Sequence, residues 1–82
     1  MNEYIATFHT HADALVSHRN LTGAGLSARM MPVPRKLSSS CGTCIRYAAD
    51  APTEHLLAED WEAVYLVSGG NVYEKVAQGD AE

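Results

Sequence analysis

The sequence predicts an α+β fold of the ferredoxin-like kind, a β-α-β-β-α-β sandwich with an antiparallel sheet and two helices on one face. Four short segments are rich in β-branched and aromatic residues or alternate apolar with polar residues, which is typical of strands. Helix-start residues stand between the first and second segments and again between the third and fourth. A chain of 82 residues suffices for one domain, which we expect over residues 1–77.

The first strand and the first helix are predicted near the N-terminus. Residues 4–8 form a β-rich run. Thr10 and Asp13 have the spacing of a capping box, which predicts a helix that runs to about residue 21 and ends in the glycine-containing segment 22–25. Four residues of this helix have core-facing spacing: Ala14, Leu15, His18 and Leu21.

The middle of the chain predicts two further strands. Residues 26–31 alternate apolar with polar side chains, as a half-buried strand does. Pro32 and Pro34 should end its pairing, because proline has no backbone donor. Residues 43–48 form the next strand after a loop.

The second helix should open at Asp50 and Pro52 and continue through Glu59, with proline near its first position. The remaining elements follow in order: a strand over residues 61–67, a turn over 68–71, an edge strand over 72–76 and a frayed tail over 78–82.

The charge of the chain is unevenly distributed. The net charge is −4, with five basic and two acidic residues in 1–49 but one basic and eight acidic residues in 50–82. We expect no nucleic-acid partner, because such proteins carry a basic domain. No apolar run approaches the roughly 18 residues that cross a bilayer, and no secretory leader is recognisable. We therefore expect a cytoplasmic protein with no membrane partner.

Both cysteines lie in one loop-like stretch, residues 32–44. Cys41 and Cys44 have C-x-x-C spacing, which in a reducing compartment is more often catalytic, redox-active or metal-binding than a structural disulfide. Three serines precede Cys41 and a glycine follows it, and two basic residues stand a few positions upstream. Positive charge nearby favours the thiolate, which is the nucleophilic form of cysteine.

The predicted topology places this loop beside the start of the first helix. A right-handed crossover makes the first two strands parallel, so the loops that follow them emerge at the same end of the sheet. Cys41 should then lie near His9, His11 and the helix N-terminus, whose free amides favour an anion.

The stretch Pro-Val-Pro-Arg-x-Leu-Ser-Ser-Ser-Cys-Gly at residues 32–42 resembles the signature of the selenium/sulfur (Se/S) carrier protein-like family. The resemblance extends from about residue 4 to about residue 67. It implies the same fold and a carrier that holds a persulfide or selenide on Cys41 for transfer between partner proteins, rather than a stand-alone enzyme. The implied partners are a cysteine desulfurase or other sulfur or selenium donor and acceptor proteins. No cofactor is expected.

The expected site residues follow from the resemblance and from the topology. The resemblance implies roles for Cys41 and for the residues around it, namely Arg35, Ser38, Ser39, Ser40 and Gly42. The topology adds His9 and His11 as groups that exchange a proton with the thiol or donate a hydrogen bond to it. Cys44 is expected to attack a Cys41 persulfide, which would release sulfide and leave a disulfide.

Other interpretations of the same residues stay open at this point. Cys41 and Cys44 suit a dithiol redox pair, or, with His9 and His11, a zinc-stabilised interaction module. Cys44 also suits a small buried strand residue, in a binding domain whose cysteines have no special role. The short second helix leaves part of a sheet face for a partner, and a homodimer is one such partner.

Overall fold

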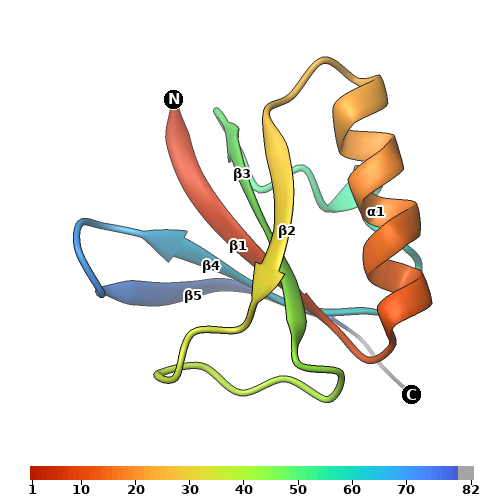
Figure 1. Ribbon diagram of the computed structural model, residues 1–82. Helices are drawn as coiled ribbons and strands as arrows, with labels where there is room; N and C mark the ends of the chain where they lie inside the picture. The colour runs from red at the N-terminus through yellow and green to blue at the C-terminus, as the bar shows by residue number, and fades with distance from the viewer. Residues whose placement is uncertain (80–82) are drawn as a thin grey trace.

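The computed structural model describes residues 1–79, where one α-helix packs on a five-stranded antiparallel sheet (Figure 1). The helix is α1 (His11–Gly23), and the strands are β1 (Asn2–Phe8), β2 (Ala28–Pro32), β3 (Thr43–Ala49), β4 (Trp61–Val67) and β5 (Tyr73–Gln78). The strand order is β2-β3-β1-β4-β5, and every neighbouring pair is antiparallel. The predicted α+β class is confirmed.

A single 3₁₀ turn, η1 (Glu54–Leu56), stands where the sequence predicts a second helix. The two-helix layer of the predicted ferredoxin-like sandwich is therefore not confirmed. Thr53, which precedes the turn, has left-handed backbone angles (φ 53°, ψ 44°), and its side chain makes no capping hydrogen bond. Leu57, which follows it, is already extended. An uncapped start and an extended residue one turn later leave no length for an α-helix.

The start of α1 has the predicted cap. The Thr10 hydroxyl accepts a hydrogen bond from the Asp13 backbone amide at 3.1 Å, which satisfies one of the free amides of the first turn. The helix ends at Gly23, and the Ala24 amide then donates to carbonyls of the last turn. The predicted boundaries therefore hold within about two residues.

The buried side of α1 differs from the predicted one. Ala14, Ser17 and Leu21 are buried, whereas the predicted core residue Leu15 is 49% exposed. Ser17 faces inward because its hydroxyl accepts a hydrogen bond from the Ala58 amide at 2.7 Å, beyond the end of η1. The predicted core residue His18 is only half-buried, and its Nε2 lies 3.1 Å from the Ala28 carbonyl oxygen.

β1 and β2 run in the same direction, because β3 lies between them and is antiparallel to both. The segment between β2 and β3 therefore leaves the sheet at the same end as the segment between β1 and α1. Figure 1 shows both at the bottom of the molecule. We call residues 33–42 the cysteine loop.

The sheet buries side chains on both faces. On the α1 side, Tyr4, Phe8, Ile45 and Val64 belong to the main apolar cluster. Ile5 and Thr7 alternate with these residues along β1 and so lie on the opposite face, where both are also inaccessible to solvent. From Tyr4 to Phe8, β1 is therefore closed to solvent on both faces.

The C-terminal end of the described chain packs beside the start of β4. Gln78 is the last residue of β5, and the Gly79 amide donates to the Glu62 carbonyl at 2.8 Å. A side chain at Gly79 would collide with the Trp61 carbonyl oxygen, since a Cβ there would lie 1.9 Å from it. The frayed tail predicted over residues 78–82 otherwise falls on residues 80–82, which lie outside the described residues.

Candidate functional site

The cysteine loop is hydrogen-bonded to the end of β1. The Ser39 hydroxyl donates to the Phe8 carbonyl at 3.0 Å, and the Val33 amide donates to the Gly42 carbonyl at 3.1 Å. Gly42 itself has φ 75°, a conformation that glycine adopts without strain, and the chain turns there into β3. The predicted neighbourhood of the loop and the β1–α1 segment is therefore present in the fold.

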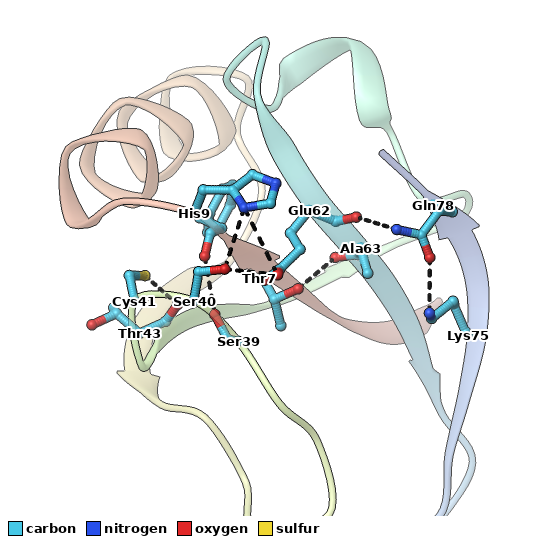
Figure 2. A network of polar contacts seen from close by, with 11 residues as sticks. Thr7, His9, Ser39, Ser40, Cys41, Thr43, Glu62, Ala63, Lys75 and Gln78 are labelled. Carbon is cyan, nitrogen blue, oxygen red and sulfur yellow. Dashed lines mark hydrogen bonds and ion pairs between the residues drawn. The ribbon is translucent and has the colours of Figure 1, made fainter. Parts of the chain in front are cut away.

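A three-residue polar cluster lies immediately before Cys41. His9 Nδ1 is 3.3 Å from Ser40 Oγ and 3.8 Å from Glu62 Oε2, and the Ser40 hydroxyl donates to that same carboxylate oxygen at 3.2 Å (Figure 2). The three side chains come from the end of β1, the cysteine loop and the start of β4. We call them the His9–Ser40–Glu62 cluster.

The proton positions in this cluster follow from the single hydroxyl proton of Ser40. Because that proton goes to Glu62, the Ser40 oxygen can accept from His9 only in a form of the imidazole that carries a proton on Nδ1. The other nitrogen of His9, Nε2, and the other oxygen of Glu62, Oε1, are buried and have no hydrogen-bond partner among the described residues. The cluster thus uses one polar atom of each of these two side chains.

Cys41 is half-buried and lies at the edge of the main apolar cluster. Its thiol donates to the Thr43 carbonyl at 3.4 Å. Among the described residues the sulfur makes no hydrogen bond to a histidine, so His9 contacts the residue before Cys41 and not its thiol. The site therefore holds a half-buried cysteine on a loop that Ser39 and Ser40 attach to neighbouring elements.

Cys44 lies in a different environment. It is inaccessible to solvent and belongs to β3, on the face opposite Ile45 and therefore opposite α1. Its thiol donates to the Pro32 carbonyl at 3.6 Å across the β2–β3 pair. Burial raises the pKa of the Cys44 thiol to about 11, and the nearby Cys41 adds to the effect. A thiol in this state is a poor nucleophile, because the thiolate is the reactive form.

Several predicted site residues are not brought to the sulfur. His11 is exposed on the first turn of α1, and Arg35 and Ser38 are exposed on the loop. None of these three makes a side-chain hydrogen bond or an ion pair with another described residue. The acidic Glu62 lies next to the loop in their place, so the surroundings of Cys41 are less positive than the sequence predicts.

The zinc set that the sequence suggested is not assembled. Cys41 packs at the edge of the apolar cluster on the α1 side, Cys44 is buried within β3, and His11 is exposed on α1. No group of three or more His, Cys, Asp or Glu side chains within residues 1–79 is placed to hold a metal ion. The burial and raised pKa of Cys44 work against the dithiol interpretation, because thiol–disulfide exchange requires an accessible thiolate.

Glu62 is the site residue that sequence reasoning missed. It is an acidic side chain within a strand, Trp61–Val67, whose other residues are apolar or aromatic. That isolated charge was the available signal. The role of Glu62 could not be predicted locally, because it depends on the pairing of β4 with β1. That pairing brings Glu62 to Ser40 of the cysteine loop, 22 residues away in the sequence.

Comparison with known proteins gives a family and one distant relative. The family described as "Putative Se/S carrier protein-like" matches residues 3–59. The uncharacterized protein YtiA of Escherichia coli (strain K12) is 33% identical over 45 residues, which are 55% of this chain and 53% of that protein. The chain thus spans about half the length of the curated relative it matches. No solved structure matches the chain significantly. Within the described residues, none of the helical structure has the length and apolar character that a bilayer crossing requires.

Proposed function

This chain belongs to the Se/S carrier protein-like family, and we propose that it carries a sulfur or selenium atom on Cys41. The carried group is a persulfide, or its selenium counterpart, and it passes from a donor protein to an acceptor protein. The observation that carries the proposal is that Cys41 is the half-buried thiol of the pair, on a loop fixed by Ser39 and Ser40.

The transfer needs no oxidant or reductant. The Cys41 thiolate attacks the terminal sulfur of a cysteine persulfide on the donor. The new bond joins Cys41 to that sulfur, the donor's S–S bond breaks, and the donor's thiolate leaves with the bonding electron pair. An acceptor thiolate later attacks the same terminal sulfur, and Cys41 leaves as its thiolate. Selenium in the terminal position follows the same steps, and thiolate attack is the common requirement.

Cys44 takes no part in this proposal. Attack by Cys44 on a Cys41 persulfide requires the Cys44 thiolate and an approach of the two sulfurs. The Cys44 thiol is buried on the other face of β3, and its pKa is raised to about 11. Storage on Cys41 without internal release suits a carrier better than a protein that discharges sulfide.

The exposed residues around the loop suit contact with partner proteins. We assign Arg35, Ser38 and His11 to that contact, because their side chains face solvent. Gly42 turns the chain beside Cys41, where its exposed backbone lets a partner's sulfur approach closely. A cysteine desulfurase is the donor class that fits, since it forms a persulfide from free cysteine. A reducing compartment such as the cytosol keeps both thiols free.

The test is sulfur loading by a cysteine desulfurase supplied with free cysteine. Intact-mass measurement without reductant should show a gain of one sulfur atom in the parent protein and in Cys44→Ala. Cys41→Ser should show no gain. A Cys41→Ser protein that gains sulfur as well as the parent does would rule out Cys41 as the carrier. Replacing cysteine with selenocysteine and a matching lyase separates sulfur from selenium as the cargo.

A further inference from the structure

The His9–Ser40–Glu62 cluster connects β1, the cysteine loop and β4 at one point (Figure 2). Its two hydrogen bonds are exposed, because Ser40 lies at the surface, but two features distinguish it from a local surface contact. It joins side chains that are 22 and 31 residues apart, and it includes a carboxylate whose side chain is only 22% exposed. The backbone of Glu62 is also held, since its carbonyl accepts from the Gly79 amide and from Gln78.

The geometry excludes a serine-histidine-acid triad. In such a triad the serine and the carboxylate bond to different nitrogens of the imidazole. Here Ser40 Oγ and Glu62 Oε2 both approach Nδ1 of His9, and Nε2 has no partner among residues 1–79. The hydroxyl proton of Ser40 also points to the carboxylate instead of the imidazole, so the arrangement does not activate Ser40 as a nucleophile.

The cluster holds the residue that directly precedes Cys41. The Ser40 hydroxyl contacts both His9 and Glu62, which are also close to each other. Ser39 is bonded independently to the Phe8 carbonyl. The two residues before the half-buried Cys41 are therefore both hydrogen-bonded to other elements of the fold.

We propose that Glu62 is a positioning residue that acts through Ser40 and holds the cysteine loop in the conformation that leaves Cys41 half-buried. Glu62 lies outside residues 3–59, which the family matches, so the family assignment does not supply this role. The inference rests on the proposed function in taking Cys41 as the reacting residue. Its test uses the thiol alone and needs no sulfur donor.

The test measures the alkylation rate of Cys41 in folded protein, with peptide mapping to separate it from Cys44. Glu62→Ala should raise the rate about threefold to tenfold, the effect expected from losing one hydrogen bond that keeps the loop closed. Glu62→Gln should restore the parent rate, because its amide oxygen accepts the Ser40 proton and the amide nitrogen replaces Oε1, which has no partner to lose. Glu74→Ala is the matched control, since Glu74 is an exposed acid on β5.

A double-mutant cycle shows whether Glu62 acts through Ser40. Ser40→Ala should raise the rate as Glu62→Ala does, and the double variant should be no faster than either single variant. If the rate increases of the two single variants multiply in the double variant, the proposal is overturned. An alkylation rate of Glu62→Ala equal to that of Glu74→Ala would overturn it too. If Glu62→Ala does not fold, Glu62→Met takes its place in the cycle, because it keeps the stem of the side chain and removes both acceptors.

The outcomes distinguish this inference from the proposed function. Suppose that the effects of Glu62→Ala and Ser40→Ala on the alkylation rate do not multiply, and that a desulfurase cannot load the protein. This result would support the positioning role and rule out the carrier role. Normal loading with uncoupled rates would support the carrier role and rule out positioning by Glu62. A purely structural role for Glu62 predicts a lower melting temperature in Glu62→Gln as well as in Glu62→Ala, without rescue of the rate.

Discussion

Cys41 and Cys44 are separated by two residues, yet they lie in opposite chemical environments. Cys41 stands on a loop, is half-buried, and follows a serine held by a histidine and a carboxylate. Cys44 stands on β3 with no accessible surface, and its thiol donates to a strand carbonyl. The comparison teaches that C-x-x-C spacing fixes distance along the chain only. Cys41 precedes β3 and Cys44 lies within it, so only the second thiol is enclosed by the sheet.

The largest difference we expect between the two thiols is in their reaction with an alkylating agent. With a pKa of about 11, roughly one Cys44 thiol in ten thousand is ionised at pH 7, about a hundredfold fewer than at the ordinary pKa of 9.0. Burial lowers its rate further. Cys41 should therefore be alkylated in folded protein while Cys44 is alkylated only after unfolding, as peptide mapping of time points would show. Equal labelling of both cysteines in folded protein would contradict the difference in burial between the two thiols.

The second expected difference is in the free energy of unfolding at alkaline pH. Cys44 has an ordinary pKa of 9.0 and a folded-state pKa of about 11, because burial disfavours its thiolate. Above pH 9 the unfolded chain therefore loses this proton before the folded chain does. The stability contribution is complete below pH 9 and is lost as the pH rises through 11, by at most about 3 kcal/mol.

Cys44→Ala isolates this contribution. At pH 7 the variant should be less stable by about 1–2 kcal/mol, because it leaves a small cavity between the strands. The difference between parent and variant should shrink as the pH rises from 9 to 11, since the variant has no thiol to ionise. Tyr47, whose pKa is also raised by burial, is present in both proteins and so cancels. Urea unfolding at pH 7, 9 and 10.5 measures the difference, and a constant value would contradict the assignment.

The sequence predicted the parts of the fold that local signals determine. The Thr10 cap, strand β3, strand β4 and the return strand β5 lie where turn residues and side-chain patterns indicate. The prediction of a second helix was wrong because the segment starts at Thr53, whose left-handed backbone no helix signal anticipates. The prediction of a core position for Leu15 was wrong because the polar Ser17 faces the core instead, where its hydroxyl accepts a hydrogen bond from the Ala58 amide.

The candidate site also contains some residues whose placement the sequence predicts and others whose placement it does not. Cys41 was predicted to lie near His9 because element order alone brings their loops to one end of the sheet, and the structure places Ser40, the residue before Cys41, beside His9. Glu62 was missed because its proximity depends on the pairing of β4 with β1. The basic residues of the loop were assigned to the thiol from their closeness in sequence, although the structure turns Arg35 to solvent. Long-range pairing and side-chain direction are the properties that a local pattern does not contain.

The smallest expected effect compares two neighbouring serines of the loop. The Ser39 hydroxyl donates to the Phe8 carbonyl at 3.0 Å and is half-buried, whereas Ser38 is exposed and makes no side-chain hydrogen bond with another described residue. Ser39→Ala should cost about 1 kcal/mol of unfolding free energy, because it removes one hydrogen bond and leaves a carbonyl unpaired. Ser38→Ala should change it by less than about 0.5 kcal/mol, as surface substitutions usually do. Urea unfolding of both variants at pH 7, together with their Cys41 alkylation rates, tests the difference. If the two variants are equally stable and equally reactive, the loop is not held through Ser39, and the environment of Cys41 must depend on the His9–Ser40–Glu62 cluster alone.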